Sequence, residues 1–261
     1  MTDTHDRAET TTAGHSEGAA DQLGELLAAL GATADESSTE VQSDAQRRDT
    51  VQLIRDIAML IPETPGAVTT TEPFTPFLDA ISQALDTDTR RLAAEALFVA
   101  AGQRPAPIAE RVETVRTLLG DEDSAVQAWS VAAVGRLAAS DPDAAGSVAD
   151  AVYDLLDHDN ETVQHNAVEA LATLARDRPD AVAPAGPRLR GLLDHDDVAI
   201  QHNVTGTLGV LAATHSEVVV PAAETIAGLT HHDEEDVRNV ARGTLARLAE
   251  ERPGAVESMT E

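Results

Sequence analysis

The segment LLDHDNETVQHNAVEALATLA, residues 155–175, decides the fold, because its pattern recurs without a gap every 37 residues. Each copy contains a leucine that closes a first helix, an acidic turn, a second helix rich in small and apolar residues, and a break that carries proline. The leucine recurs as Leu118, Leu155, Leu192 and Leu229. A period of roughly 20 to 50 residues is typical of solenoids built from stacked helical units.

Other positions keep the same register and predict where each helix begins and which face it buries. The apolar positions of the second helix are Val126, Val163, Ile200 and Val237; Val134, Leu171, Leu208 and Leu245; and Leu137, Leu174, Leu211 and Leu248. Proline is tolerated in a first turn, so the first helices should start at Pro105, Pro142, Pro179 and Pro253, with Ser216 in the remaining repeat. The expected N-caps of the second helices are Asp123, Asn160, Asp197 and Glu234.

This pattern resembles HEAT repeats, over residues 74–253 and more loosely over residues 21–61. The resemblance implies an all-α fold, a right-handed α-solenoid of about five to six helical hairpins. It also implies that the second helices line a concave surface and that the protein holds partner proteins.

HEAT units usually place aspartate in the turn and arginine just after the valine, which forms an ionic ladder between neighbours. This chain has Asp121 and Arg238 at those positions. Elsewhere it carries His158, His195 and His232 in the turn and Gln127, Gln164 and Gln201 after the valine. We expect a stack of amides and imidazoles to replace most of the ladder, or these side chains to be free to meet a ligand.

The chain is expected to contain three segments. Residues 1–19 are predicted to be a disordered acidic tail, residues 20–61 a degenerate helical unit with a linker, and residues 74–261 the repeat array. Within the N-terminal unit, helices are predicted over residues 21–30 and 45–61. The second of these helices places Val51, Ile54, Ala58 and Ile61 on one face and ends at Pro62.

The charge balance is strongly acidic. Asp and Glu number 46 against 18 basic residues, all of them arginine, for a net charge of -28. Such a chain repels itself in dilute buffer, whereas at 1 M salt the Debye length falls to about 3 Å. We therefore expect a cytoplasmic protein of a halophile, in particular a haloarchaeon; an acidic mesophilic protein is the alternative.

Several functional classes are disfavoured by what the sequence lacks. The absence of cysteine excludes disulfides, thiolate metal sites and a cysteine nucleophile. The opening MTDTHDRAET has no signal-peptide pattern, and no apolar run is long enough to span a bilayer. Phosphate-loop and HExxH motifs are also missing. The only basic concentration is Arg238, Arg242 and Arg247, so a nucleic-acid partner is not expected.

Histidines alternate with aspartates in the repeated turns, which raises the question of a metal site. Equivalent positions in adjacent repeats are separated by about 10 Å, the distance between packed helices. Ligands of one ion must lie within about 2 Å of it. We therefore expect no metal and no cofactor.

Some repeated features leave two interpretations open. The tripeptide Gln-His-Asn at residues 164–166 and 201–203 lies off the core face, either as an inter-repeat hydrogen-bonded ladder or as contacts to an extended partner. Glycine is unfavourable inside a helix, so Gly135, Gly206, Gly209 and Gly243 indicate either close helix packing or a shallow groove. Trp129 is either part of the core of its unit or an exposed anchor.

The leading hypothesis is a non-enzymatic adaptor that binds a protein or peptide along the concave face. Its expected partner-binding residues are Gln164, His165, Gln201, His202, Arg238 and Arg242. Self-association through the C-terminal repeat is also expected, because only a partial unit follows the helix at residues 237–248. The alternative is an enzyme similar to the HEAT-like lyases, which hold a tetrapyrrole or a modified protein.

Overall fold

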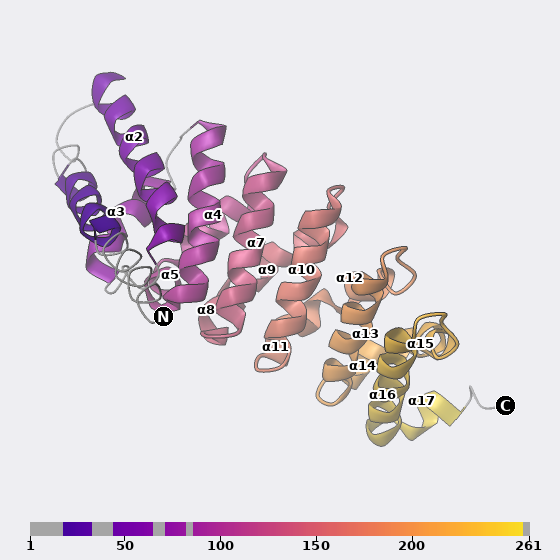
Figure 1. The fold of residues 1–261 in the computed structure, drawn as a ribbon. Helices are drawn as coiled ribbons and strands as arrows, with labels where there is room; N and C mark the ends of the chain where they lie inside the picture. The colour runs from indigo at the N-terminus through magenta and orange to yellow at the C-terminus, as the bar shows by residue number, and fades with distance from the viewer. Residues whose placement is uncertain (1–17, 33–43, 65–70, 82–85, 258–261) are drawn as a thin grey trace, which may run out of the picture. The chain divides into compact units, whose positions relative to one another are not determined.

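The structure, a computed structural model, describes residues 18–32, 44–64, 71–81 and 86–257. These residues form helices and turns and contain no strand, so the all-α prediction is confirmed (Figure 1). The chain divides into two compact units, Met1–Ala133 and Val134–Glu261. Most of the expected tail and of the linker after residue 32 lies outside the described residues.

Unit 1 begins with a helix over residues 18–32. Its further elements are α2 (Asp44–Leu60), the 3₁₀ turn η1 (Ile61–Glu63), α3 (Thr71–Ile81), α4 (Thr87–Gln103), α5 (Pro105–Glu110), α6 (Val112–Leu119) and α7 (Ser124–Ala138), within which the unit boundary falls. The first helix buries Leu23, Leu27 and Leu30. A methyl group on Gly31 would lie 3.4 Å from the ring of Pro76, which places this helix against α3.

The predicted face of α2 is largely correct. Ile54, Ala58 and Ile61 are buried and Val51 is half-buried. Ile57, which the prediction omitted, is also fully buried. The α-helix ends at Leu60 and Pro62 lies in the following 3₁₀ turn, as expected for a residue that lacks an N–H group.

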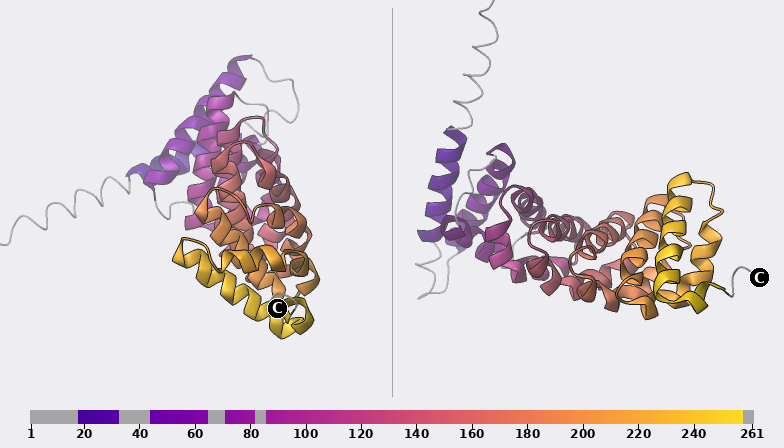
Figure 2. Two further views of the ribbon diagram at one scale, coloured as in Figure 1. Left: turned by 90° about the vertical axis from the view of Figure 1, so that its right-hand side faces the viewer. Right: turned by 90° about the horizontal axis from the view of Figure 1, so that it is seen from below.

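Unit 2 contains three complete helical pairs after the end of α7, followed by α17 (Figure 2). Its second helices are α10 (Glu161–Leu174), α13 (Val198–Ala212) and α16 (Glu235–Glu251). Each of the three first helices is broken into three pieces. The first consists of α8 (Pro142–Ser147), α9 (Ala149–Tyr153) and η2 (Asp154–Asp157), the second of α11 (Pro179–Val182), η3 (Ala183–Ala185) and α12 (Gly186–Gly191), and the third of α14 (Ser216–Val219), η4 (Val220–Ala222) and α15 (Ala223–Leu229). The short helix α17 (Pro253–Glu257) follows α16.

The break in each first helix corrects the expectation of one continuous helix. It falls at the same register in every repeat, at Arg111, Val148, Ala185 and Ala222, whose ψ angles lie between -8° and 31°. At Arg111 and Val148 the backbone leaves the α-helical region, whereas Ala185 and Ala222 stay at its edge. Proline precedes the break in only two repeats, as Pro184 and Pro221, so the repeat geometry and not proline alone sets the kink.

The predicted helix starts are confirmed. Proline opens α5, α8, α11 and α17, and Ser216 opens α14. The side chains of Asn160 and Asp197 accept two backbone N–H groups each, and Asp123 accepts those of Ala125 and Val126. Glu234 occupies the N-cap position but its side chain makes no capping hydrogen bond, because the longer glutamate is a poorer N-cap than aspartate or asparagine.

The forward stripe of an inner second helix consists of the first, fifth, eighth and twelfth positions after its valine or isoleucine; the last three are buried in α7, α10 and α13, and the first is buried only in α13. In α13 this forward stripe is Gln201, Thr205, Leu208 and Ala212. It packs against α16, where the hydroxyl of Thr244 donates to the carbonyl of Thr205 at 2.9 Å. Residues i, i+4, i+7 and i+11 lie on one side of a helix. The forward stripe of one second helix is therefore the surface on which the second helix of the next repeat packs.

The sequence left open whether the helix glycines allow close helix packing or leave a shallow groove, and their surroundings differ from one glycine to the next. A methyl group on Gly209 would lie 2.5 Å from Oγ1 of Thr244, so this glycine is required for close packing of α13 on α16. At Gly135 and Gly206 the nearest atoms of the neighbouring helix would lie at ordinary contact distance, 3.6 Å and 3.5 Å. Nothing lies within 4 Å of the same position at Gly243.

These differences predict opposite effects for two glycine substitutions. Gly209→Ala should destabilise the protein by about 1 to 3 kcal/mol through overpacking. Gly243→Ala, the matched control on the next second helix, should stabilise it by up to about 1 kcal/mol, because alanine is the better helix former. Denaturant unfolding followed by circular dichroism measures both, and a Gly209→Ala variant as stable as Gly243→Ala would contradict the packing.

Candidate functional site

The turn histidines act as acceptors within their own turns. The backbone N–H groups of Asn160, Asp197 and Glu234 donate to the Nδ1 atoms of His158, His195 and His232 at 2.8, 2.9 and 3.0 Å. In the repeat that keeps aspartate, Asp121 accepts the N–H of Asp123 in the same way, at 2.9 Å. An imidazole Nδ1 thus takes the place of a carboxylate oxygen as the acceptor in the turn. The expected stack of imidazoles between repeats is wrong.

The glutamines also bond within their own repeat, which corrects the expected inter-repeat amide ladder. Their side-chain amides donate to the carbonyl eight residues earlier: Gln127 to Leu119, Gln164 to Leu156 and Gln201 to Leu193, at 3.2, 2.8 and 3.1 Å. These carbonyls lie at the end of the first helix, where backbone acceptors lack helical partners. Arg238, in the same register of the last repeat, donates instead to the carbonyls of His232 and Asp233 in the turn after α15.

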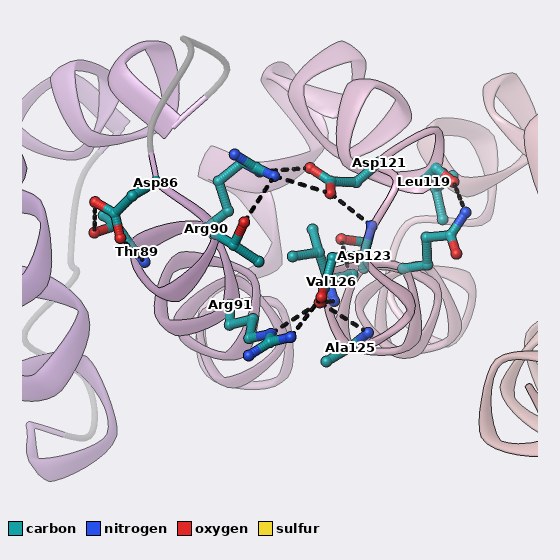
Figure 3. A network of polar contacts seen from close by, with 12 residues as sticks. Asp86, Thr89, Arg90, Arg91, Leu119, Asp121, Asp123, Ala125 and Val126 are labelled. Carbon is teal, nitrogen blue, oxygen red and sulfur yellow. Dashed lines mark hydrogen bonds and ion pairs between the residues drawn. The ribbon is translucent and has the colours of Figure 1, made fainter.

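An ionic ladder between repeats persists in unit 1 (Figure 3). Arg90, in the register of Gln127, lies 2.7 Å from Asp121 of the next repeat. Arg91 makes two hydrogen bonds to Asp123, the N-cap of α7, at 3.0 and 2.6 Å. The Arg91 hydrogen bond, aided by backbone N–H groups, lowers the pKa of Asp123 from its usual 3.8 to about 2. This ladder was not predicted, although Arg90 stands 37 residues before Gln127.

A second set of contacts between repeats lies just before the first helices of unit 2. Arg178 pairs with Asp143, and His215 Nε2 lies 3.2 Å from Asp180. Arg252 donates to the hydroxyl of Ser216 at 3.0 Å. Residues 178, 215 and 252 each stand one residue before a predicted helix start. The 37-residue spacing could therefore have identified them as equivalent positions that contact the preceding repeat.

Two neighbouring second helices of unit 2 present the same polar residues toward solvent. We define the second-helix surface as His165, Asn166 and Glu169 of α10 together with His202, Asn203 and Gly206 of α13. α10 and α13 pack side by side, so His165 and His202, which are equivalent residues of their repeats, lie on neighbouring helices. All six residues are half-buried except Glu169, which is exposed. The Nδ1 atom of His202 is buried and has no hydrogen-bond partner within the structure.

The six sequence-predicted site residues therefore fall into three groups. His165 and His202 lie together on the second-helix surface. The side-chain amides of Gln164 and Gln201 are occupied by carbonyls of their own repeats, and Gln201 is only 9% exposed. Arg238 and Arg242 lie on α16, where Arg242 donates to the carbonyl of Thr230 at 3.2 Å.

The second-helix surface is unusually poor in charge for this chain. Among 261 residues there are 46 acidic ones, yet α13 contains no charged residue along its 15 positions. Glu169 is the only charged side chain of the surface. The adjoining turns carry exposed Asp159, Asp196 and Asp233. Depletion of charge is also a general feature of the cores of protein interfaces.

Aromatic side chains meet on the second helices of unit 1. Phe98 of α4 and Trp129 of α7 have ring centroids 5.3 Å apart and are both half-buried. Trp129 therefore packs against the neighbouring repeat and is neither fully in the core nor an exposed anchor.

Among the residues that the structure describes, no group of three or more His, Asp or Glu side chains is placed to hold a metal ion. No helix in these ranges is long and apolar enough to cross a membrane.

The fold is shared with designed helical-repeat proteins. An engineered protein from a structural genomics programme, target OR329, matches with a TM-score of 0.63 at 21% identity, covering 88% of this chain and 97% of that one. A designed armadillo repeat protein in complex with the peptide (KR)4 matches with a TM-score of 0.65 at 19% identity, covering 87% and 99%. Computationally designed armadillo repeat proteins for modular peptide recognition match with a TM-score of 0.65 at 20% identity, covering 86% and 99%.

No protein-family model and no curated protein matches the chain. At these identities the structural matches show the fold, a helical-repeat solenoid.

The Arg91–Asp123 contact predicts a specific pH dependence. A carboxyl group whose pKa is lower in the folded state stabilises that state above its unfolded pKa, and this contribution disappears as the pH falls to the folded pKa. The stability difference between wild type and Asp123→Asn should therefore be constant from about pH 7 to about pH 5 and shrink between about pH 4 and pH 2. Urea unfolding across this range tests it; an unchanging difference would contradict the ionic contact.

The Gln201 amide should be structural. Gln201→Ala removes the only side-chain donor shown to the carbonyl of Leu193 and should cost about 1 to 3 kcal/mol of unfolding free energy. Gln201→Glu keeps the shape but cannot donate when ionised, so it should be at least as destabilising. Urea unfolding measures both variants. Full stability of Gln201→Glu at neutral pH would show that the hydrogen bond contributes nothing.

Proposed function

We propose that this protein is a non-enzymatic adaptor that binds a polypeptide segment on the second-helix surface of unit 2. One observation carries the proposal: the surface is uncharged in its centre, although the chain around it is densely acidic. A surface exposed only to concentrated salt would be expected to carry the same excess of acid as the turns. Depletion of charge at this place is instead typical of the centre of an interface.

The residues of the surface suit a polypeptide backbone. Histidine and asparagine side chains each offer a donor and an acceptor, which match the alternating N–H and C=O groups of an extended chain. Packed helices are separated by about 10 Å, which an extended chain crosses in about three residues. Repeated His-Asn pairs on α10 and α13 would then meet a bound segment at regular intervals.

The similar designed proteins support the general mode of binding. One is described in complex with the peptide (KR)4 and another is described as made for modular peptide recognition. Helical repeats of this kind can therefore present an extended surface to a peptide. The identity of this chain's partner does not follow from them, because at about 20% identity the likeness concerns the fold.

We further propose that the protein works in the salt-rich cytoplasm of a halophile. The net charge of -28 and the complete replacement of lysine by arginine support this setting. Exposed aspartates occupy the turns of every repeat in unit 2, where they hold water and repel one another. An uncharged interface retains its affinity in such a medium, because hydrogen bonds inside an interface and apolar contacts are less screened than surface ion pairs.

Partner capture from the native cytoplasm tests the adaptor function. Tagged wild type should retain one stoichiometric protein, and the double variant His165→Ala, His202→Ala should lose it by at least about tenfold, which corresponds to about 1.4 kcal/mol. His231→Ala is the matched control, because this histidine is exposed and lies in a turn outside the surface. Circular dichroism confirms that all variants are folded. Equal recovery by wild type and the double variant would contradict the proposed site.

Salt should stabilise the fold. Raising KCl from about 0.1 M to about 1 M shortens the Debye length from about 10 Å to about 3 Å and should raise the thermal midpoint. A variant with Asp159, Asp194, Asp196 and Asp233 changed to asparagine should respond less, because these exposed aspartates contribute to the repulsion. An equal response of both proteins would show that turn repulsion does not cause the salt requirement.

A further inference from the structure

The histidines of the second-helix surface differ from the other histidines that the structure describes. Five Nδ1 atoms lie within hydrogen-bonding distance of a partner, either a backbone N–H group of the same turn or the hydroxyl of the preceding threonine: those of His158, His195, His232, His215 and His231. His165 and His202 have no hydrogen bond in the structure. The histidine rings without a partner are therefore the two that belong to the second-helix surface.

His202 differs from its equivalent, His165, in the burial of one ring nitrogen. Its Nδ1 atom is the one buried side-chain nitrogen or oxygen that lacks a hydrogen-bond partner in the described part of the chain. Nε2 of the same ring also makes no hydrogen bond, and it is not buried. Nδ1 thus lies inside the protein, and Nε2 reaches the second-helix surface.

The buried Nδ1 atom determines which hydrogen-bonding group the ring presents. A neutral imidazole carries one proton, on Nδ1 or on Nε2, and the nitrogen without the proton is an acceptor. A proton on Nδ1 would bury an N–H group that has no acceptor, and such groups are rarer in folded proteins than acceptors without a donor. A proton on Nε2 instead keeps the donor in contact with solvent. The geometry therefore favours a ring that presents an N–H group to the surface.

We propose that His202 donates a hydrogen bond from Nε2 to a main-chain carbonyl of the partner segment. The proposal rests on the adaptor function and names the group of the partner that this residue recognises. Because Nδ1 is already buried in the free protein, binding removes only Nε2 of this ring from water, and Nε2 gains the carbonyl in return. His202 therefore contributes more to the affinity than His165, neither of whose ring nitrogens is buried.

The surroundings of His202 favour a carbonyl over the other acceptors of a polypeptide. A donor can meet a carboxylate, a hydroxyl or a carbonyl oxygen. Exposed Asp196 and Asp233 in the adjoining turns, and Glu169 on the surface itself, repel a carboxylate. The side-chain amide of Asn203, the next residue, makes no hydrogen bond in the structure and can pair with the N–H and C=O groups of the same main-chain stretch. A main-chain carbonyl is the acceptor that fits both residues.

The position of the His202 proton is measured on the free protein. In the full chain with isotope-labelled histidine, long-range proton–nitrogen correlation spectra distinguish a protonated ring nitrogen from an unprotonated one. The signals that disappear in His202→Gln belong to His202. We expect a proton on Nε2 and none on Nδ1. A protonated Nδ1 would overturn the inference, whether or not a partner is found.

Two substitutions separate the two ring positions in partner binding, and the probe is the protein that tagged wild type retains from the native cytoplasm. The amide nitrogen of glutamine reaches the place of Nε2, whereas that of asparagine reaches only the place of Nδ1. His202→Gln should keep its affinity within about threefold, and His202→Asn should lose about tenfold or more. The same two substitutions at His165 are the matched control and should differ little from each other. Urea unfolding checks that every variant is folded.

The outcomes distinguish the carbonyl contact from the adaptor function. Equal losses in His202→Gln and His202→Asn would overturn the contact and leave the function in place, whereas a wild type that retains no protein would contradict the function and the contact with it. In a synthetic peptide of the bound segment, replacement of asparagine and glutamine by alanine should leave the affinity unchanged. Loss of binding by that peptide would assign the acceptor to a side-chain amide and overturn the main-chain contact.

Discussion

The packing of one second helix on the forward stripe of the preceding one is the constraint on which the rest of the structure depends. In unit 2 this contact brings small and branched side chains together so closely that Gly209 has no room for a methyl group beside Thr244. The stripe must be closely packed and of fixed width, so residues of similar size recur there every 37 positions. Everything else in a repeat, including the caps, the kink and the polar turn, positions this stripe for its neighbour.

The polar contacts of the turn change along the chain while the packing stays the same. In unit 1 arginine and aspartate connect successive repeats, as Arg90 does with Asp121. In unit 2 histidine and glutamine bond within the first two turns, as in the pairs His195–Asp197 and Gln201–Leu193, whereas Arg238 takes the place of the glutamine in the last turn. The second-helix surface, whose one charged side chain is Glu169, lies beside turns that carry exposed Asp159 and Asp196.

The sequence predicted the parts of the fold that local chemistry and periodicity determine. The prolines at helix starts, the capping by Asp123, Asn160 and Asp197, and the buried valines follow from side-chain chemistry at a fixed register. The kink at Val148 could not be predicted, because no residue type marks it. The partners of Gln164 and His158 were also missed, because register alone does not say whether a polar side chain bonds within its repeat or across to the next.

The central claim is that a polypeptide partner lies on the second-helix surface, and site-specific photo-cross-linking tests it most directly. A photoreactive residue replaces Glu169, which is exposed on that surface, or Glu224, which is exposed on α15. After irradiation in the native high-salt cytoplasm, the account predicts a single protein adduct from position 169 and none from position 224. The same adducts from both positions, or an adduct from position 224 alone, would contradict it.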